Sequence, residues 1–342
     1  QGDDGADSLT GGAGIDTRSG GNGADTLDGG DGADSLSGGN DDDRLIAIND
    51  NDTLNGGIGT DVASFAALVL ALNLDLFVGS ADSGQLAFTI SGIEDVEGTA
   101  FNDTIGGDGG ANLILGDLGD DLLSGNNGAD TLQGGDGDDT LLGDDGADSL
   151  LGGNGIDTVV FMDTAVGVVI DLSSGTMTND GHGNADTFTG IENVEGSHNA
   201  DTIIGDAAAN YLSGDDGDDS ITGGGGADIL EGGTGFDVFI YNSETDSGVG
   251  EALRDVILDF EDGLDLINIE SIIGLDMFDF RTDAEGGEFT GTTGIVEARF
   301  NNETKILEID TDSDMQADME IEMQNTEGSS LDETDFTNST PA

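Results

Sequence analysis

The stretch Gly20–Asp28, with the sequence GGNGADTLD, decides the fold of this 342-residue chain. Its pattern, G-G-x-G-x-D-x-U-x with U a large apolar residue, returns at Gly134–Leu142 as GGDGDDTLL. Glycine accepts the backbone angles of tight turns, and three residues such as Thr26–Asp28 suffice for a short strand that points one side chain inward. Each nonapeptide therefore predicts one tight turn followed by one short β-strand.

The sixth position of the pattern is Asp or Asn every nine residues through three blocks of the chain. The eighth position is a large apolar residue in all but two of these repeats, where Arg18 and Ala63 occupy it. Repeats of this regularity predict a solenoid. One apolar residue per nonapeptide is what a thin core between two sheets can bury, so we expect an all-β solenoid in which two repeats make one coil and the eighth-position side chains fill that core.

These nonapeptides resemble those of the RTX (repeats-in-toxin) family, whose hemolysin-type repeats form a calcium-stabilised parallel β-roll. The segment after the last block extends the resemblance. There GGTGFDVFI at Gly232–Ile240 is followed by DVILDFEDGLDLI at Asp255–Ile267, which is similar to the C-terminal cap of serralysin-type proteases and of mannuronan epimerase modules. The resemblance implies a calcium-binding β-solenoid that ends in a β-rich capping domain.

Stacked carboxylates explain why such a roll needs a cation. With two repeats per coil, Asp7 stacks on Asp25 at the strand spacing of roughly 4.8 Å. The chain has 74 acidic and 6 basic residues and a net charge of -68, so these stacks would repel one another. Ca²⁺, with ligand distances of about 2.3–2.6 Å, fits between two carboxylates, and glycine carbonyl oxygens complete its coordination, whereas Mg²⁺ requires a smaller, strictly octahedral site. We therefore predict multiple Ca²⁺ ions as cofactors.

The predicted calcium ligands are the acidic residues at the sixth position of each repeat. They are Asp7, Asp16, Asp25, Asp34, Asp43, Asp52, Asp61, Asp103, Asp121, Asp130, Asp139, Asp148, Asp157, Asp201, Asp219, Asp228 and Asp237. Two repeats have lost the carboxylate, since Asn112 and Asn210 occupy the sixth position. We expect weaker sites there.

A second kind of acidic loop lies near the C-terminus, in DTDSDMQADMEIEM. Its side chains Asp310, Asp312, Asp314 and Asp318 have the spacing of positions 1, 3, 5 and 9 in an EF-hand loop. It departs from that loop because Met315 replaces the turn-forming glycine and Ile321 replaces the bidentate Glu. The alternatives are a further calcium site and a solvated acidic turn.

Two interludes with matching sequences separate the blocks. They contain SGIEDVEGTAFNDTI and TGIENVEGSHNADTI, and the equivalent residues Asp61 and Asp157 lie 96 residues apart, which indicates a duplication. Apolar runs at residues 71–76 and 168–172 predict strands, and residues 175–190 predict a polar hairpin tip or loop. We interpret the interludes as longer coils of the same stack; the alternative is a small separate domain in each.

The domain organisation expected from these patterns has six parts. They are β-roll blocks at 1–64, 98–160 and 196–240, β-rich interludes at 65–97 and 161–195, and a serralysin-like cap with a secretion region at 241–342.

No catalytic constellation stands out, so we do not expect an enzyme. The two histidines, His182 and His198, belong to no H-E-x-x-H motif, and no G-x-S-x-G elbow or cysteine occurs in the sequence. The six basic residues are scattered, which argues against nucleic acid as a partner. The apolar run Ala66–Leu72 is too short to span a membrane.

The function predicted from these features is that of a non-catalytic calcium-binding structural module of a secreted bacterial protein, located extracellularly or at the cell surface. The chain begins QGDDGADS, without the basic and apolar regions of a signal peptide. Similarity of Leu331 and Phe336 to a C-terminal L-x-x-x-D-F motif implies export by a type I secretion apparatus, with folding when extracellular calcium fills the stacked sites.

Two alternatives remain from other functional classes. The chain is the C-terminal auxiliary half of a secreted enzyme such as a protease, lipase or epimerase, or it is a self-assembling extracellular filament or surface-layer subunit. The second alternative requires self-association through an open N-terminal end of the roll, because stacked repeats need a polar cap at each end.

Overall fold

The computed structural model describes residues 1–48, 50–162, 164–182, 184–273, 277–282, 289–292, 295–324, 331 and 335–336. The chain forms two compact units, one made of residues 1–159 with 184–191 and the other of residues 160–183 with 192–342. These units differ from the six parts expected from the repeat pattern, because the second interlude contributes residues to both.

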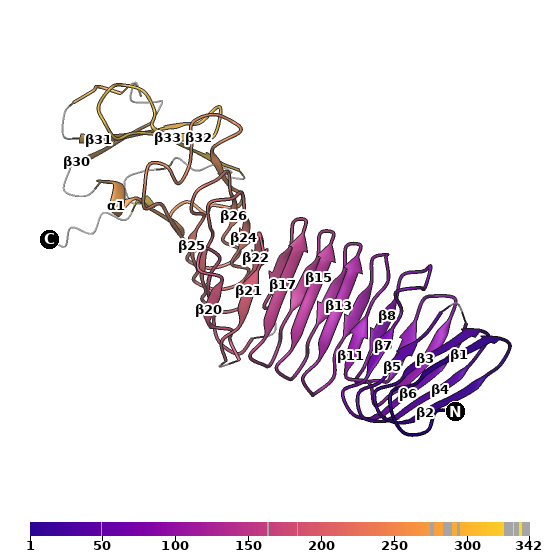
Figure 1. The fold of residues 1–342 in the computed structure, drawn as a ribbon. Coiled ribbons are helices and arrows are strands. Elements are labelled where there is room, and N and C mark those ends of the chain that lie inside the picture. The colour runs from indigo at the N-terminus through magenta and orange to yellow at the C-terminus, as the bar shows by residue number, and fades with distance from the viewer. Residues whose placement is uncertain are drawn as a thin grey trace. The chain divides into compact units, whose positions relative to one another are not determined.

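Unit 1 is a roll of two sheets in which alternate repeats supply alternate sheets. The strands of the first sheet are all parallel, in the order β1 (Ser8–Ala13), β3 (Thr26–Asp31), β5 (Arg44–Ile46), β7 (Val62–Ser64), β11 (Asp95–Glu97), β13 (Leu113–Leu118), β15 (Thr131–Asp136), β17 (Ser149–Asn154) and β21 (Thr187–Thr189). Figure 1 shows β13, β15 and β17 as successive arrows of this sheet.

The second sheet of unit 1 includes the first interlude. Its order is β2 (Thr17–Asn22), β4 (Ser35–Asn40), β6 (Thr53–Ile58), β10 (Ala87–Ser91), β9 (Ser80–Asp82), β8 (Asn73–Asp75), β12 (Thr104–Gly106), β14 (Leu122–Ser124), β16 (Thr140–Leu142) and β18 (Thr158–Val160). Strand β9 is antiparallel to both of its neighbours, and the remaining pairs are parallel. The first interlude therefore extends the sheet and forms no separate domain.

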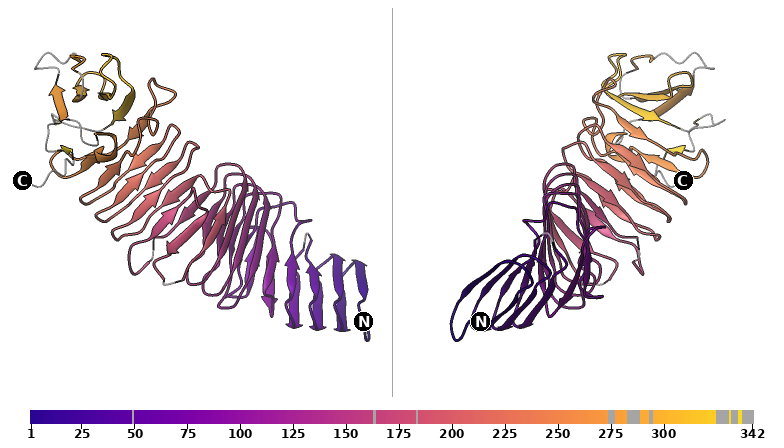
Figure 2. Two further views of the ribbon diagram at one scale, coloured as in Figure 1. Left: turned by 60° about the vertical axis from the view of Figure 1, so that its left-hand side comes forward. Right: turned by 90° about the vertical axis from the view of Figure 1, so that its right-hand side faces the viewer.

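The eighth-position side chains form the core between the sheets, as the pattern predicts. Residues eighteen apart are direct neighbours, for example Leu27 with Leu45 and Leu132 with Leu150. Each of these four side chains is at most 1% exposed. The parallel strands near the N-terminus, which carry the same pattern, stand edge to edge in the left view of Figure 2.

The structure accommodates both exceptions at the eighth position. Arg18 aligns with Leu36, but its guanidinium turns to the Asp16 carboxylate at 3.2 Å and to the carbonyl oxygen of Thr17. Ala63 is fully buried between Leu45 and Val96. A charged side chain is thus compatible with this position where a neighbouring acidic residue pairs with it.

Unit 2 also has two sheets, and its second sheet ends in the cap. The first sheet has the order β20 (Thr176–Asn179), β19 (Val169–Asp171), β23 (Thr202–Ile204), β25 (Ser220–Thr222), β27 (Val238–Ile240) and β29 (Leu266–Asn268). The second has the order β22 (Asn193–Glu195), β24 (Tyr211–Ser213), β26 (Ile229–Glu231), β28 (Asp255–Ile257), β33 (Met319–Met323), β32 (Ile306–Asp310), β31 (Ile295–Asn301) and β30 (Met277–Thr282).

The cap also contains the short helix α1 (Glu270–Ile273) and the described residues of the C-terminal motif. Phe336 forms a β-bridge with Ile267 and packs against Phe278 and Phe280. Leu331 is 1% exposed and Phe336 5% exposed. The two apolar residues of the predicted secretion motif are therefore part of the folded cap. In the part of the chain that the structure describes, no helix has the length and apolar character needed to cross a membrane.

The prediction for residues 175–190 was wrong in part. Thr176–Asn179 form β20, antiparallel to β19, and Thr187–Thr189 form β21, which adds to β17. Asp186 and Phe188 stand in the sixth and eighth positions of a repeat that lacks the usual glycine pair, so the local signal for this strand is weak.

Candidate metal-binding columns

The sixth-position side chains form columns along each unit, one beside each sheet. In the second sheet of unit 1, Asp103, Asp121, Asp139 and Asp157 follow one another at intervals of eighteen residues. Fifteen of the predicted ligands are at most 2% exposed, while Asp7 and Asp16 are half-buried. The predicted stacking of Asp7 on Asp25 is present, with the Asp7 amide 2.7 Å from the Asp25 carboxylate.

One oxygen of each stacked carboxylate accepts a hydrogen bond from the preceding coil. The backbone N–H of Asp103 donates to Oδ1 of Asp121 at 2.7 Å, and that of Asp121 donates to Oδ1 of Asp139 at 2.8 Å. In unit 2 the amide of Asp219 donates to Asp237 at 2.9 Å. This ladder fixes the side-chain angle of each carboxylate, so that the other oxygen, Oδ2, points in the same direction in each coil.

The second oxygen is buried and lacks a donor in most repeats. Within the described residues, Oδ2 has no hydrogen-bond partner in Asp25, Asp34, Asp43, Asp61, Asp121, Asp130, Asp139, Asp219, Asp228 and Asp237. A buried carboxylate oxygen without a donor is costly, because transfer of a polar group from water is unfavourable unless a partner replaces the solvent. A cation is a suitable partner for a row of such oxygens.

The first glycine of each repeat leaves space beside this oxygen. A Cβ added to Gly116 would lie 2.2 Å from Oδ2 of Asp121 and 2.6 Å from the carbonyl oxygen of Gly134 in the next coil. A Cβ on Gly214 would meet Oδ2 of Asp219 at 2.1 Å in the same way. Glycine at Gly116 and Gly214 thus leaves room where a carboxylate oxygen and a main-chain oxygen converge.

Burial and mutual repulsion perturb the acidity of these groups. Burial, with repulsion from Asp103 and Asp139 added, raises the pKa of Asp121 to about 7. The same causes raise the pKa of Asp219 to about 7, with Asp201 and Asp237 as its acidic neighbours. The ionised forms of Asp121 and Asp219 are therefore disfavoured unless a positive charge offsets the repulsion from their acidic neighbours.

The donor set fits calcium. Carboxylate and main-chain carbonyl oxygens are hard ligands of the kind that Ca²⁺ binds in sets of six to eight. The orphan Oδ2 atoms, the converging glycine carbonyls and the raised pKa values all occur at the same positions of the repeat. Asp121, Asp139 and their equivalents would hold the ion, which would supply the missing positive charge.

Besides Glu94, which accepts the Asp61 amide at 2.9 Å, three aspartate column members were missed at the sequence level. Asp186 accepts the Asp148 amide at 2.7 Å, Asp255 accepts the Asp228 amide at 2.9 Å, and Asp265 accepts the Asp237 amide at 3.1 Å. None lies in a full glycine-rich repeat. The signal that would have found them is the triplet of Asp, any residue and a large apolar residue, as in Asp255-Val256-Ile257.

The EF-hand-like loop is assembled in part. Carboxylate oxygens of Asp310, Asp312 and Asp314 lie within 4.8 Å of one another. Asp318 instead accepts hydrogen bonds from the amide and hydroxyl of Thr311, at 2.8 and 2.7 Å. Met315 has a left-handed φ of 70°, the conformation for which glycine was expected. The loop thus has the predicted turn, and three of its four predicted ligands come together.

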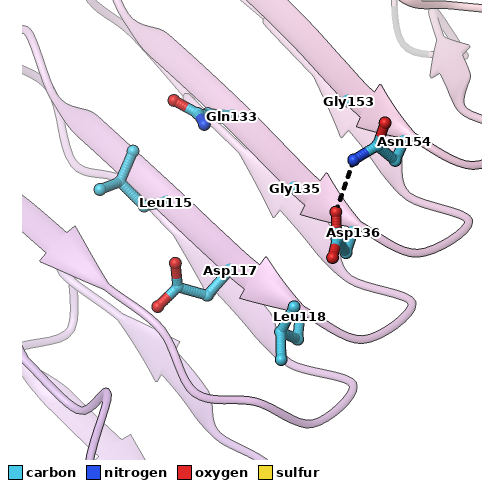
Figure 3. Close-up of a pocket in the computed structure, with 8 residues that line it drawn as sticks. All are labelled: Leu115, Asp117, Leu118, Gln133, Gly135, Asp136, Gly153 and Asn154. Carbon is cyan, nitrogen blue, oxygen red and sulfur yellow. Dashed lines mark hydrogen bonds between the residues drawn. The ribbon is translucent and has the colours of Figure 1, made fainter.

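A separate pocket of about 520 Å³ lies over β13, β15 and β17 (Figure 3). Its lining includes Asp117, Gln133 and Asp136, and Asn154 donates a hydrogen bond of 2.7 Å to Asp136. None of its eight lining residues occupies a sixth position. This pocket is therefore distinct from the columns.

Comparison with known proteins points to the same repeats. The family model described as RTX calcium-binding nonapeptide repeat (4 copies) matches residues 1–36, 19–47, 28–63, 88–123, 124–159, 186–219 and 204–239, which together cover more than half of the chain. A search of curated proteins finds no match. Among solved structures, the chain is similar to the extracellular lipase LipA from Serratia marcescens, with 16% identity and a TM-score of 0.20. That alignment covers 69% of this chain and 40% of the lipase, so the chain spans less than half of that protein.

Proposed function

The chain belongs to the RTX calcium-binding nonapeptide repeat family, and we propose from that premise that it is a non-catalytic structural module of a secreted protein, which folds when extracellular calcium fills its columns. The observation that carries the proposal is the row of buried Oδ2 atoms that lack a donor within the described residues. Calcium would pair with these oxygens only in the folded roll, where the coils bring them together.

Thermodynamic linkage couples calcium binding to the stability of the folded state. A ligand that binds the folded state alone adds its binding free energy to stability, about 2.7 kcal/mol per site at a concentration 100 times the dissociation constant. Extracellular calcium modules have dissociation constants of about 10⁻⁴ to 10⁻³ M. The columns link many such sites, so we expect a steep transition at calcium concentrations typical of the extracellular space. At low calcium the net charge of -68 favours the expanded chain.

Burial of the C-terminal motif supports the same order of events. Leu331 and Phe336 are core residues of the cap, so a secretion apparatus that binds them must do so before the cap folds. Export of an unfolded, calcium-free chain followed by folding outside the cell satisfies this requirement.

The test is far-UV circular dichroism with size-exclusion light scattering during a calcium titration from EGTA to about 10 mM, with magnesium as the control. We expect a cooperative coil-to-β transition with calcium and none with magnesium at the same concentration. The titration is run at about pH 8, where the column carboxylates are ionised, and full β-structure in EGTA at that pH would refute calcium-coupled folding. The mass measured in calcium separates a monomeric module from a self-assembling subunit.

A further inference from the structure

The backbone conformation at the second position separates two kinds of repeat. In the ten glycine-rich nonapeptides named above whose sixth-position Oδ2 lacks a described donor, the second-position residue is left-handed, whether it is glycine, Asp or Asn. These residues are Gly21, Gly30, Gly39, Gly57, Asp117, Asn126, Gly135, Asp215, Gly224 and Gly233, with φ between 68 and 132°. In this conformation the second-position N–H does not reach the sixth-position carboxylate.

The loop that begins the second block differs. Its second-position residue, Thr99, is not left-handed, and its N–H donates to Oδ2 of Asp103 at 2.6 Å. The Thr99 hydroxyl donates to Oδ1 of Asp103 at 2.8 Å, and the Leu72 amide donates to the same oxygen at 2.7 Å. Both oxygens of this carboxylate therefore have protein donors.

The loop that begins the third block repeats this arrangement. Ser197 donates from its N–H to Oδ2 of Asp201 at 2.5 Å and from its hydroxyl to Oδ1 at 2.8 Å. The amide of Val168 supplies the third hydrogen bond, at 2.7 Å. These three hydrogen bonds favour the charged form of Asp201 and oppose the rise in pKa that burial causes.

In the loop that follows each of these, the polar atoms of the sixth-position side chain also have protein hydrogen-bond partners, but this side chain is an uncharged Asn. We call a loop closed when its sixth-position side chain is paired in this way. Oδ1 of Asn112 accepts the N–H of Asp108 at 2.9 Å, and its Nδ2 donates to the carbonyl oxygen of Glu94 at 2.6 Å. Asn210 makes the equivalent hydrogen bonds to Asp206 at 2.9 Å and to Glu192 at 2.8 Å. An Asn at this position contributes no charge to the column and satisfies both of its polar atoms.

We propose that residues 98–112 and 196–210 are calcium-independent segments, closed by Thr99 and Ser197 and by Asn112 and Asn210, from which the calcium-dependent coils extend. The proposal rests on the proposed function and deepens it, because it removes Asp103 and Asp201 from the set of calcium ligands. Each compact unit contains one such segment, in equivalent places of the duplicated sequence. In a stack whose coils contact their neighbours alone, a preformed coil is a template on which the next one folds.

The hydrogen bonds that oppose the effect of burial differ between Asp103 and Asp121. Burial raises the pKa of Asp103, but the hydrogen bonds from Thr99 and Leu72 oppose this shift. In Asp121 the backbone hydrogen bond from Asp103 is the one that opposes burial, and the pKa reaches about 7.

The first experiment counts bound calcium in the full chain after equilibrium dialysis at saturating calcium. Asp121→Asn removes a carboxylate with an orphan oxygen, and we expect the count to fall by at least one ion. Asp103→Asn removes a carboxylate whose oxygens have protein donors, and we expect an unchanged count. Equal losses in the two variants would overturn the proposal. If neither the wild type nor any variant bound calcium, the proposed function itself would fail.

The second experiment does not depend on a variant that folds. Hydrogen–deuterium exchange of the wild-type chain below the calcium midpoint should show slower exchange in residues 98–112 and 196–210 than in residues 116–139 and 214–237. Thr99→Gly should make protection of residues 98–112 calcium-dependent, whereas the matched Thr99→Ser, which copies Ser197, should preserve it. Uniform exchange across all four segments of the wild type would overturn the proposal.

Discussion

Asp121 illustrates the contacts that the repeat requires of its sixth-position carboxylate. One of its oxygens accepts the Asp103 amide, and the other faces Gly116 without a partner in the described structure. Three requirements meet there: a fixed carboxylate, a glycine that leaves room, and a carbonyl oxygen of Gly134 from the next coil. The residue identities could be predicted from the nine-residue period.

Substitution of the first-position glycine tests this geometry. In Gly116→Ala the new Cβ would lie 2.2 Å from Oδ2 of Asp121, so the carboxylate must move and the convergence of oxygens is lost. We expect loss of at least one calcium ion and destabilisation by about 1–3 kcal/mol, measured by calcium counting and by urea unfolding in calcium. Gly109→Ala is the control, because nothing lies within 4 Å of its added Cβ and its backbone is not left-handed. Equal effects of both substitutions would contradict the assignment.

Other features of the site could not be predicted from residue types. Asp103 and Asp121 occupy the same position of the repeat, yet the hydroxyl and amide of Thr99 reach the first carboxylate and no described donor reaches Oδ2 of the second. The difference depends on a backbone angle two residues into the loop. Asp117, a non-glycine residue, is left-handed in one repeat, while Thr99 is not in another. Composition alone does not specify that angle.

At the scale of one strand, each repeat buries a single eighth-position side chain in the core between the two sheets. In β14 Leu123 is fully buried, while its neighbour Leu122 is 42% exposed. Adjacent residues of a strand point to opposite faces, so one of these two leucines faces solvent and the other faces the core.

This alternation gives a matched pair of substitutions. Leu123→Ala should destabilise the calcium-bound protein by about 2–5 kcal/mol, because it leaves a cavity in a core only one side chain deep. Leu122→Ala should change stability by less than about 0.5 kcal/mol, as expected for a surface site. Chemical unfolding at saturating calcium measures both. If the two variants were equally stable, β14 would have a different register.

Most strands could be predicted from the period, and the exceptions have a common cause. Residues 71–76 and 168–172 contain strands β8 and β19, as their apolar runs indicated. Residues 187–189 were missed because the preceding loop lacks the glycine pair. Their strand pairs with β17 and places Phe188 beside Leu150, so burial in the sheet decides the structure where the local signal is weak.

At the scale of the whole molecule, charge links folding to pH as well as to calcium. Burial raises the pKa of Asp121 and Asp219 to about 7 and that of Asp255 to about 8, against 3.8 for the free side chain. At pH values between the pKa of the free side chain and the raised pKa values, these carboxyl groups keep their protons in the folded state and have lost them in the unfolded state. Stability of the calcium-free protein therefore falls as pH rises through this range.

Circular dichroism in EGTA as a function of pH checks this coupling. We expect β-structure in the calcium-free protein at about pH 5 and its loss by about pH 8, when the columns have ionised. Calcium should restore the structure at the higher pH, because it binds the deprotonated carboxylates. Light scattering must accompany the measurement, since the sequence pI is about 4.1 and acid reduces the charge that keeps molecules apart. A β signal that increased with pH in EGTA would contradict the prediction.

The eighteen-residue register between neighbouring strands also determines how the molecule would respond to a pulling force. Similar ladders of hydrogen bonds join consecutive coils. Force applied at the two chain termini would therefore detach the coils one after another, beginning with a terminal coil, which has a neighbour on one side alone. Each detached coil would release a contour length of about 60 Å, the extended length of eighteen residues. Ladders closed by Thr99 and Ser197 would keep their resistance in EGTA, while the others would yield. The order in which the coils unfold under force would thus show which loops bind calcium.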